Sequence, residues 1–442
     1  MSKSHSPSTA LLTDQYELTM VQAALANGTA DRRCVFEVFT RRLPAGRRYG
    51  VVGGTGRFLE ALTEFRFTDA ELEHLRAKGN FNDELLQFLA DYRFSGNIYG
   101  YAEGEVFFPG SPVLVVESTF AEGVILETLA LSVLNYDSAV ASAASRMTSA
   151  AGSRPCLEMG SRRAHEQAAV AAARAAVVGG FSSTSNLEAG RRYGLQTIGT
   201  AAHSFTLLHD DEQSAFAAQV AAFGPNTTLL VDTFDIAEGV RRAIDAAGTE
   251  LDAVRLDSGD LGVVAGEVRE QLDGLGAAGT KIVVSSDLDE HAIAALAVAP
   301  VDAYGVGTSL VTGSGAPTAG MVYKLVSREG RGGQMESVEK ASSAKTSVGG
   351  RKNAARRFDS AGRAEEEIVV AGAGAGWVPD EDDLRPLQVP LVLDGEVDRS
   401  YIGADGVQRA AQRHQRSRAE LSPYARRLSA GDPALETVHR SI

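Results

Sequence analysis

Between about residues 121 and 325, short apolar runs alternate with alanine-rich amphipathic stretches, and each apolar run ends in a polar cluster. Three runs end at Asp232, Asp257 and Asp287, which are 25 and 30 residues apart. This is the spacing of strand–helix units, so the pattern predicts a parallel sheet. In a (β/α) barrel, polar residues at the carboxyl ends of the strands face one mouth, where the chemistry takes place. We therefore expect an α/β fold with an irregular (β/α) barrel, and an open doubly wound sheet is the alternative because strand order cannot be read from sequence.

The expected strands of this zone can be placed from their apolar residues. They are 157–159, 196–198, 228–231, 253–256, 282–284 and 303–304. The helix that opens the zone has Ile125, Leu126, Leu129 and Val133 at helical spacing.

The segments on either side of the barrel have a different pattern. Apolar runs at 35–39 and 113–116 indicate strands in a mixed segment, whereas residues 326–370 are rich in Lys, Ser, Gly and β-branched residues and predict exposed hairpins. Residues 371–376 form a Gly-Ala connector, residues 391–393 a short strand, and the tail from Ser422 a helix. We expect a second, mixed α+β domain in which the C-terminal segment packs with the N-terminal one. The expected boundaries are a disordered tail at 1–10, an N-terminal mixed segment at 11–120, the barrel with the active site at 121–325, and a C-terminal β-rich segment and tail at 326–442.

Composition and charge exclude several classes of protein. The 442 residues are 44% hydrophobic and 23% charged, as in globular proteins. The net charge of −14 opposes binding to nucleic acid or to anionic lipid. Only Cys34 and Cys156 are present, without metal-ligand spacing, which favours a reducing cytoplasm over a disulfide or zinc scaffold. Residues 1–10 are polar and no run of eighteen apolar residues occurs, so we expect no targeting segment and no membrane span.

Two loops after predicted strands carry residue types that suit a sugar phosphate. Arg255, Asp257 and Asp260 place a cation and two carboxylates around a glycine turn, which suits phosphate with Mg²⁺ or ribose hydroxyls; the alternative is that the aspartates cap the next helix. Gly305 and Gly307 leave backbone N–H groups open to phosphate oxygens, and a tight turn is an equal alternative.

Other candidates are individually weaker. Ser285 can donate to the same phosphate or cap a helix. His203 follows a predicted strand, where an imidazole can act as an acid, a base or a phosphoryl acceptor, although a lone histidine is more often structural. Arg162 can bind a carboxylate or pair with a surface glutamate, and Arg41 lies in a cationic loop that can hold pyrophosphate or remain solvated. Tyr16 can stack on a ring or belong to the core.

Five segments together resemble the nicotinate phosphoribosyltransferase family, in the family's order and over about residues 11–355. They are Leu-Thr-Asp-Gln-Tyr-Glu-Leu-Thr-Met at 12–20, Phe-Glu-Val-Phe-Thr-Arg-Arg-Leu-Pro at 36–44, Glu-Met-Gly-Ser-Arg-Arg at 158–163, Gly-Thr-Ala-Ala-His-Ser at 199–204 and Arg-Leu-Asp-Ser-Gly-Asp at 255–260. Residues 345–352 also look like the family's C-terminal β segment.

The resemblance implies ATP-assisted transfer of 5-phosphoribose from phosphoribosyl pyrophosphate to nicotinic acid, with Mg²⁺ required and no metal held by protein ligands alone. It implies catalytic roles for His203, as the residue phosphorylated by ATP, and for Asp257. It implies a nicotinate site of Arg162, Ser185 and Asn186, with Tyr16 contributed by a neighbouring subunit, and hence a homodimer with a shared active site. The implied phosphoribose and pyrophosphate residues are Arg41, Arg255, Asp257, Ser258, Gly259, Ser285, Gly305, Gly307, Thr308 and Lys345.

The substrate that this resemblance implies agrees with the chemistry of the residues. Nicotinate is an aromatic anion, so it needs an arginine and a stacking face. Met159 stands where related nicotinamide-using enzymes have a phenylalanine, and Asn186 where they have an aspartate; loss of that carboxylate favours an acid over an amide. The alternatives are a quinolinate- or nicotinamide-using phosphoribosyltransferase and, outside enzymes, a metabolite-binding barrel without turnover.

Overall fold

The computed structural model describes residues 8–44, 46–339 and 348–441 and divides into two compact units. Unit 1 combines the chain up to Ser142 with the chain from Ala316 onward, and unit 2 is the continuous segment Ala143–Gly315. This confirms the expected fold class, a mixed domain made from both ends of the chain beside an α/β domain with a curled parallel sheet. The long helix α6 (Glu127–Ala151) begins in unit 1 and ends in unit 2.

Unit 1 is built around a seven-stranded sheet. Its order is β13 (Met335–Ser337), β12 (Met321–Glu329), β1 (Arg33–Thr40), β5 (Leu114–Thr119), β3 (Asn97–Tyr101), β17 (Gln388–Leu393) and β18 (Glu396–Val397). Strand β1 is rich in β-branched and aromatic residues and is buried over seven of its eight residues, as expected for a central strand. The predicted strands at 35–39, 113–116 and 391–393 are confirmed.

The two faces of strand β1 pack against different parts of unit 1. Phe36 and Val38 belong to the large apolar core, whereas Val35 joins Val115 and Val326 in a separate small cluster. The helices of this unit are α1 (Gln15–Ala26), α2 (Thr55–Thr63), α3 (Asp69–Ala77), α4 (Asp83–Asp91), α5 (Phe120–Val124) and α15 (Gly403–Glu420). Buried residues of α1, α2, α3 and α4 also belong to the large core.

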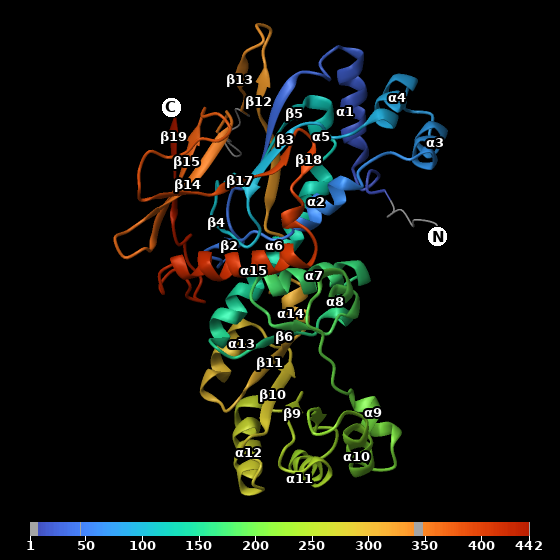
Figure 1. The fold of residues 1–442 in the computed structure, drawn as a ribbon, viewed down its shortest axis with the longest axis vertical. Helices are drawn as coiled ribbons and strands as arrows, with labels where there is room; N and C mark the ends of the chain where they lie inside the picture. The colour runs from blue at the N-terminus through green and yellow to red at the C-terminus, as the bar shows by residue number, and fades with distance from the viewer. Residues whose placement is uncertain (1–7, 45, 340–347, 442) are drawn as a thin grey trace. The chain divides into compact units, whose positions relative to one another are not determined.

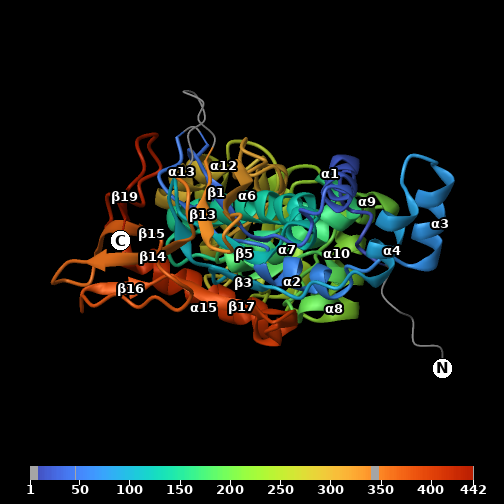
Figure 2. The same ribbon diagram turned by 90° about the horizontal axis from the view of Figure 1, so that it is seen from above.

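The remaining strands of unit 1 form two smaller sheets. The four-stranded sheet has the order β16 (Leu384–Pro386), β14 (Lys352–Phe358), β15 (Ala364–Ala371) and β19 (Glu436–Ser441), and the two-stranded sheet pairs β2 (Gly50–Val51) with β4 (Val106–Phe107). Figures 1 and 2 show the four-stranded sheet and the α3–α4 pair at opposite ends of unit 1.

A buried ion network joins the four-stranded sheet to α15. Arg356 has no exposed side-chain surface and pairs with Glu105 at 2.8 Å, Glu420 at 3.1 Å and Glu367 at 3.2 Å. Burial alone would raise the pKa of Glu105, but Arg356 and Arg385 lower it to about 2. The network therefore keeps the buried carboxylate of Glu105 charged.

Replacing Arg356 with methionine is expected to destabilise the protein by about 3–5 kcal/mol, because it leaves the buried Glu367 without its cation and leaves Glu105 with Arg385 alone. The neighbouring Arg357, whose side chain is 20% exposed, pairs with partly exposed acids, so Arg357→Met is the matched control and should destabilise the protein much less. Urea denaturation measures both. Equal losses for the two variants would contradict this assignment.

Unit 2 contains a six-stranded parallel sheet. Its order is β7 (Ser183–Thr184), β6 (Cys156–Glu158), β11 (Ala303–Val306), β10 (Lys281–Ser286), β9 (Ala253–Leu256) and β8 (Thr228–Leu230). The helices are α7 (Glu166–Val178), α8 (Leu187–Tyr193), α9 (His203–Leu208), α10 (Glu212–Phe223), α11 (Ile236–Ala247), α12 (Leu261–Gly274), α13 (Glu290–Ala295) and α14 (Thr308–Val311), with the 3₁₀ turns η1 (Ser161–Arg163) and η2 (Leu296–Val298). Figure 1 shows α11 and α12 beside strands β9 and β10.

Three local expectations are corrected by the structure. The predicted strand at 196–198 is reduced to a single bridge, in which Thr197 pairs with Thr184. The predicted tail helix after Ser422 is wrong, because helix α15 ends at Glu420 and the described residues after Leu421 contain no helix. Ser8 and Thr9, expected in a disordered tail, donate hydrogen bonds to the carbonyls of Arg66 and Ala61, while residues 1–7 lie outside the described part.

Within the described residues, one helical stretch, Phe120–Ala151, has the length and composition of a membrane span. An 18-residue window in it has a mean hydropathy of 1.3, and 67% of that window is buried inside the protein. Its buried positions include Leu126, Leu134 and Val140, so its apolar surface is used for packing within the protein, as in a core helix.

Candidate active site

The carboxyl ends of β9 and β10 bring three predicted residues into one cluster. Arg255 donates from Nε to Ser285 Oγ at 2.7 Å and pairs through Nη2 with Asp257 Oδ1 at 3.3 Å. Ser285 Oγ in turn donates to the same Asp257 oxygen at 2.6 Å. Because β9 and β10 are adjacent parallel strands, residues 30 positions apart in sequence become neighbours. The cluster presents one cation, one carboxylate and one hydroxyl at the mouth of the sheet.

Asp232, which follows β8, joins this cluster to the next loop. Its Oδ2 accepts hydrogen bonds from the backbone N–H of Asp257 at 2.8 Å and from Ser258 Oγ at 2.7 Å. Its other oxygen, Oδ1, is buried without a hydrogen-bond partner and lies 4.0 Å from His203 Nε2. Asp232 thus fixes the Asp257–Ser258 turn and keeps a free carboxylate oxygen facing the histidine.

His203 begins helix α9 and remains accessible. Its side chain is 42% exposed, and Nδ1 lies 3.1 Å from Thr233 Oγ1. Thr233 and Asp232 are consecutive residues, so one turn contacts both ring nitrogens. An imidazole held at both nitrogens, with an open face, is suited to nucleophilic or acid–base chemistry.

Gly305 is in β11 and Gly307 follows it; at Gly305, a Cβ would lie 2.8 Å from Met159 Sδ and 3.0 Å from Ser285 Cβ, so no side chain fits without displacing a neighbour. After β9, Gly259 has a φ of +86°, a conformation that L side chains rarely adopt. Thr308 is the first residue of α14 and is exposed. The glycines thus allow close packing and a tight turn at these strand ends.

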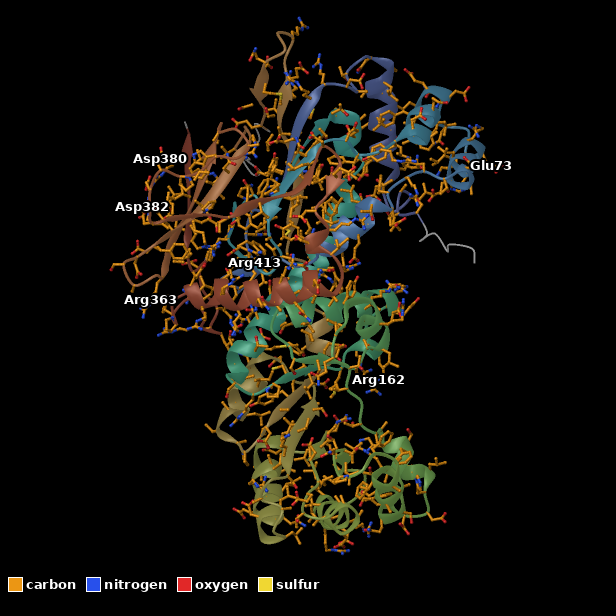
Figure 3. The ribbon with its side chains drawn as sticks, in the orientation of Figure 1. Glu73, Arg162, Arg363, Asp380, Asp382 and Arg413 are labelled. Atoms are coloured by element: carbon orange, nitrogen blue, oxygen red, sulfur yellow. The ribbon has the colours of Figure 1, made fainter. Side chains whose placement is uncertain are left out.

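The ends of β6 and β7 hold the residues predicted for the second substrate. Asn186 caps α8 by accepting from the N–H of Ala189 at 2.8 Å, and its Nδ2 donates to Ser161 Oγ at 3.0 Å. Ser185 is half-buried, and its N–H donates to the Glu158 carbonyl. Arg162 lies in η1, a 3₁₀ turn after the strand, and is exposed on unit 2 (Figure 3). Its guanidinium makes no hydrogen bond or ion pair within the described residues.

Family models match most of the chain. The N-terminal domain of nicotinate phosphoribosyltransferase (NAPRTase) matches residues 11–135, and the nicotinate phosphoribosyltransferase (NAPRTase) family matches residues 155–367. The chain is 56% identical over 437 residues to nicotinate phosphoribosyltransferase pncB1 of Mycobacterium tuberculosis (strain CDC 1551 / Oshkosh), covering 97% of this chain and 94% of the relative. The chain belongs to the nicotinate phosphoribosyltransferase family. It is therefore an enzyme, as the sequence resemblance indicated.

Other relatives agree with this membership. Nicotinate phosphoribosyltransferase of Bacillus subtilis (strain 168) is 36% identical over 374 residues, covering 82% of this chain and 76% of the relative. The crystal structure of human nicotinic acid phosphoribosyltransferase matches with a TM-score of 0.82 at 26% identity, covering 97% of both chains. The fold and the family thus coincide over nearly the whole length.

Two predicted site residues of this family member lie in unit 1, and a third lies outside the described residues. Tyr16 is in α1 of unit 1 and is 46% exposed, and burial together with Glu127 raises its pKa to about 12, so the phenol stays protonated. Arg41 follows β1 in unit 1, with its guanidinium 5.7 Å from the Phe39 ring centroid. Lys345 lies outside the described residues. Their roles stay predictions.

Three further residues that bond to the predicted ones are not identified as site residues from the sequence. Asp232 is recognisable there only as a strand end, although its position after an apolar run beside Asp257 is a usable signal. Thr200, whose hydroxyl accepts from Arg255 Nη1 at 3.1 Å, and Thr233 became visible only through side-chain contacts between separate loops.

The residues present fit a Mg²⁺ ion that arrives with its substrate. The described residues contain no group of three or more His, Cys, Asp or Glu side chains placed to hold a metal. Asp257 uses Oδ1 for Arg255 and Ser285, and its Oδ2 has no hydrogen-bond partner in the described chain. Magnesium is commonly bound by one or two carboxylates together with substrate phosphates and water, which matches this donor set.

Proposed function

We propose that this enzyme transfers 5-phosphoribose from phosphoribosyl pyrophosphate to nicotinic acid, giving nicotinate mononucleotide and pyrophosphate in NAD salvage. We further propose that ATP is hydrolysed through a phosphohistidine at His203. One observation carries the proposal. His203 lies next to Asp232, and Asp232 is bonded to the Arg255–Ser285–Asp257 cluster. The side chain proposed to be phosphorylated is thereby connected to the side chains proposed to bind phosphate.

The transfer reaction needs charge stabilisation more than proton transfer. The bond from the sugar C1 to pyrophosphate breaks with its electron pair leaving on pyrophosphate, and the pyridine nitrogen forms the new bond with its own lone pair. No general base is required. Arg255 and the N–H groups around Gly305 and Gly307 hold phosphate oxygens, while Asp257 binds the ribose or its Mg²⁺ and supports positive charge near C1. Ser258, Gly259, Ser285 and Thr308 complete the phosphoribose site.

The ATP reaction uses the geometry around His203. A ring nitrogen with a free lone pair attacks the terminal phosphorus of ATP, the phosphorus–oxygen bond breaks, and ADP leaves with that electron pair. The other ring nitrogen keeps the proton, and the carboxylate of Asp232 stabilises the positive ring. Water later hydrolyses the phosphohistidine to phosphate. Asp232 also accepts a hydrogen bond from the Asp257 N–H, so phosphorylation of His203 affects the turn at Asp257 and Ser258, which we assign to the ribose.

The nicotinate site is assigned to unit 2 with help from a second copy. Arg162, exposed and unpaired in the described chain, supplies the cation for the carboxylate, and Ser185 and Asn186 supply polar contacts. Tyr16 of a neighbouring subunit stacks on the pyridine, and Arg41 and Lys345 serve the pyrophosphate. This arrangement requires a homodimer with a shared site, and we place the reaction in the cytoplasm.

Magnesium, when bound, supplies charge neutralisation on the departing pyrophosphate. On the protein side, the second oxygen of Asp257 is the donor available for it. The affinity of the protein for Mg²⁺ is therefore expected to be much higher when phosphoribosyl pyrophosphate is bound.

The test is an assay of the purified protein with nicotinate, phosphoribosyl pyrophosphate and Mg²⁺, with and without ATP. Nicotinate mononucleotide and ADP are followed together, and nicotinamide and quinolinate are run in parallel. Product from nicotinate alone, increased by ATP with release of ADP, is the expected result. Product from another pyridine would overturn the proposed substrate, and product from none of the three would overturn the proposed reaction.

A further inference from the structure

The last residue of β6, Glu158, is a carboxylate with no exposed surface. Its Oε1 accepts from the N–H of Gly160 at 2.5 Å, and its Oε2 accepts from the hydroxyl of Thr184 at the end of β7. Among the described residues, no lysine, arginine or histidine forms an ion pair with it. The carboxylate is therefore held by two neutral donors that come from two different loops.

A carboxylate in this place is costly for the fold. Burial raises the pKa of Glu158, and the hydrogen bonds from Thr184 and Gly160 offset that effect only in part. A buried charge without a cation opposes folding, and an apolar side chain would fill the same space without that cost. Positions at which folding is opposed in this way are concentrated at functional sites.

The contacts of Thr184 extend the arrangement toward the proposed nicotinate site. Its hydroxyl donates to Glu158 and accepts from the N–H of Asn186 at 2.9 Å. The N–H of Ser185 donates to the main-chain carbonyl of Glu158 at 2.8 Å. The first residues of the loop after β7 are thus bonded, directly or through one hydroxyl, to Glu158.

The loop after β6 is tied to the same carboxylate. Gly160 immediately precedes η1, the turn that contains Arg162, and its N–H points at Glu158. A second tie, from Asn186 Nδ2 to Ser161 Oγ at 3.0 Å, closes the connection between the two loops. Any change in the Glu158–Thr184 pair must therefore alter the spacing between Arg162 and Asn186.

We propose that Glu158, acting with Thr184, is a positioning residue that sets the distance between Arg162 and Asn186 and so determines affinity for the pyridine substrate. The inference rests on the proposed function, because it takes these two residues as the nicotinate contacts. Glu158 does not touch the substrate; it acts through the two loops.

The first variant is Thr184→Val, which keeps the shape of the side chain and removes its hydroxyl. The KM for nicotinate is expected to rise about tenfold, whereas the KM for phosphoribosyl pyrophosphate should stay within about twofold, because the Arg255 cluster lies on other strands. Thr184→Ser restores the hydroxyl and should recover most of the affinity for nicotinate. Glu158→Gln should show the same split as Thr184→Val, since a glutamine amide has one acceptor oxygen and cannot accept from both Thr184 and Gly160.

Ser183 provides a matched control on the same short strand. Its hydroxyl is buried and has no hydrogen-bond partner in the described structure, so Ser183→Ala removes a buried hydroxyl without breaking either loop contact. This variant should leave both KM values within about twofold of wild type.

A change of both KM values in equal proportion in Thr184→Val, or an unchanged nicotinate KM in a protein with wild-type melting temperature, would overturn the inference. Failure of the proposed function looks different. A wild-type enzyme that prefers another pyridine would overturn the proposed substrate, and the same comparison of KM values then applies to that pyridine.

Discussion

Replacing His203 with alanine is expected to abolish the ADP release that accompanies nucleotide synthesis and to leave slow, ATP-independent synthesis. The imidazole contacts both Asp232 and Thr233, so its loss removes the proposed phosphoryl acceptor from this turn. The Arg255 cluster is untouched by this change, so phosphoribosyl pyrophosphate still binds. Initial rates of ADP and nicotinate mononucleotide, measured together with and without ATP, check the result.

His209 is the matched control for this variant. It ends the same helix, with Nδ1 2.9 Å from the Phe205 carbonyl and its ring packed against that of Phe205, and it contacts no residue of the site. His209→Ala should keep the ratio of ADP to nucleotide product. Unchanged ADP production by His203→Ala would remove His203 from the proposed role.

Replacing Arg255 with methionine is expected to lower kcat by about 10²- to 10³-fold, the cost of removing one preorganised charge that stabilises a developing anion. Its guanidinium contacts Ser285, Asp257 and Thr200, so the variant also loses the contacts that join these three loops. Arg255→Lys keeps the charge but loses the planar fork, and its rate should lie between those of the wild type and the methionine variant.

Rates at varied phosphoribosyl pyrophosphate and saturating nicotinate measure this effect. Arg241, which is half-exposed on α11 and pairs with Glu238 and Asp245, gives the control Arg241→Met, with rates expected near wild type. A reduced rate of similar size in the two variants would mean that loss of stability, and not loss of phosphate contacts, is responsible.

The repeated strand–helix spacing was enough to predict most of the parallel sheet, because each strand end is marked by polar residues after an apolar run. Residues 228–231, 253–256 and 282–284 were placed within about two residues of β8, β9 and β10. Residues 196–198 failed because only Thr197 pairs. An apolar run indicates that a segment can form a strand. Whether residues 196–198 pair along their whole length depends on the length of the neighbouring strand, and β7 has only two residues.

Helix α15 was missed because its buried stripe is not apolar. The buried positions Val407, Ala410, His414 and Ser417 follow helical spacing, but two of them are polar. The Ser417 hydroxyl accepts a hydrogen bond from Arg356 of the buried ion network, and no local sequence pattern can indicate such a contact. Ser422–Pro423 has the composition of a helix start, but it comes directly after the end of α15. A proline suits the first position of a helix and also a position just past its end, so the pair alone does not distinguish the two.

Candidate site residues on adjacent strands were predictable, and the contacts between them were not. Arg255, Asp257 and Ser285 could be grouped because parallel strands end at one edge. The role of Asp232 depends on β8 lying beside β9, and that neighbour relation is a property of sheet order. Tyr16 and Arg41 are in unit 1, so the sequence resemblance alone connects them to the site.

The sheet of unit 1 has a consequence for how the chain is made on the ribosome. Strand β1 (Arg33–Thr40) needs β12 (Met321–Glu329) along one edge, and β3 needs β17 (Gln388–Leu393). The N-terminal strands therefore emerge nearly 300 residues before their partners, and during that time they present unpaired edges to other chains. Unit 2 is one continuous segment, so it can fold as it emerges. Nascent chains halted before about residue 330 are therefore expected to need chaperones at the unpaired N-terminal strands and not at the parallel sheet of unit 2.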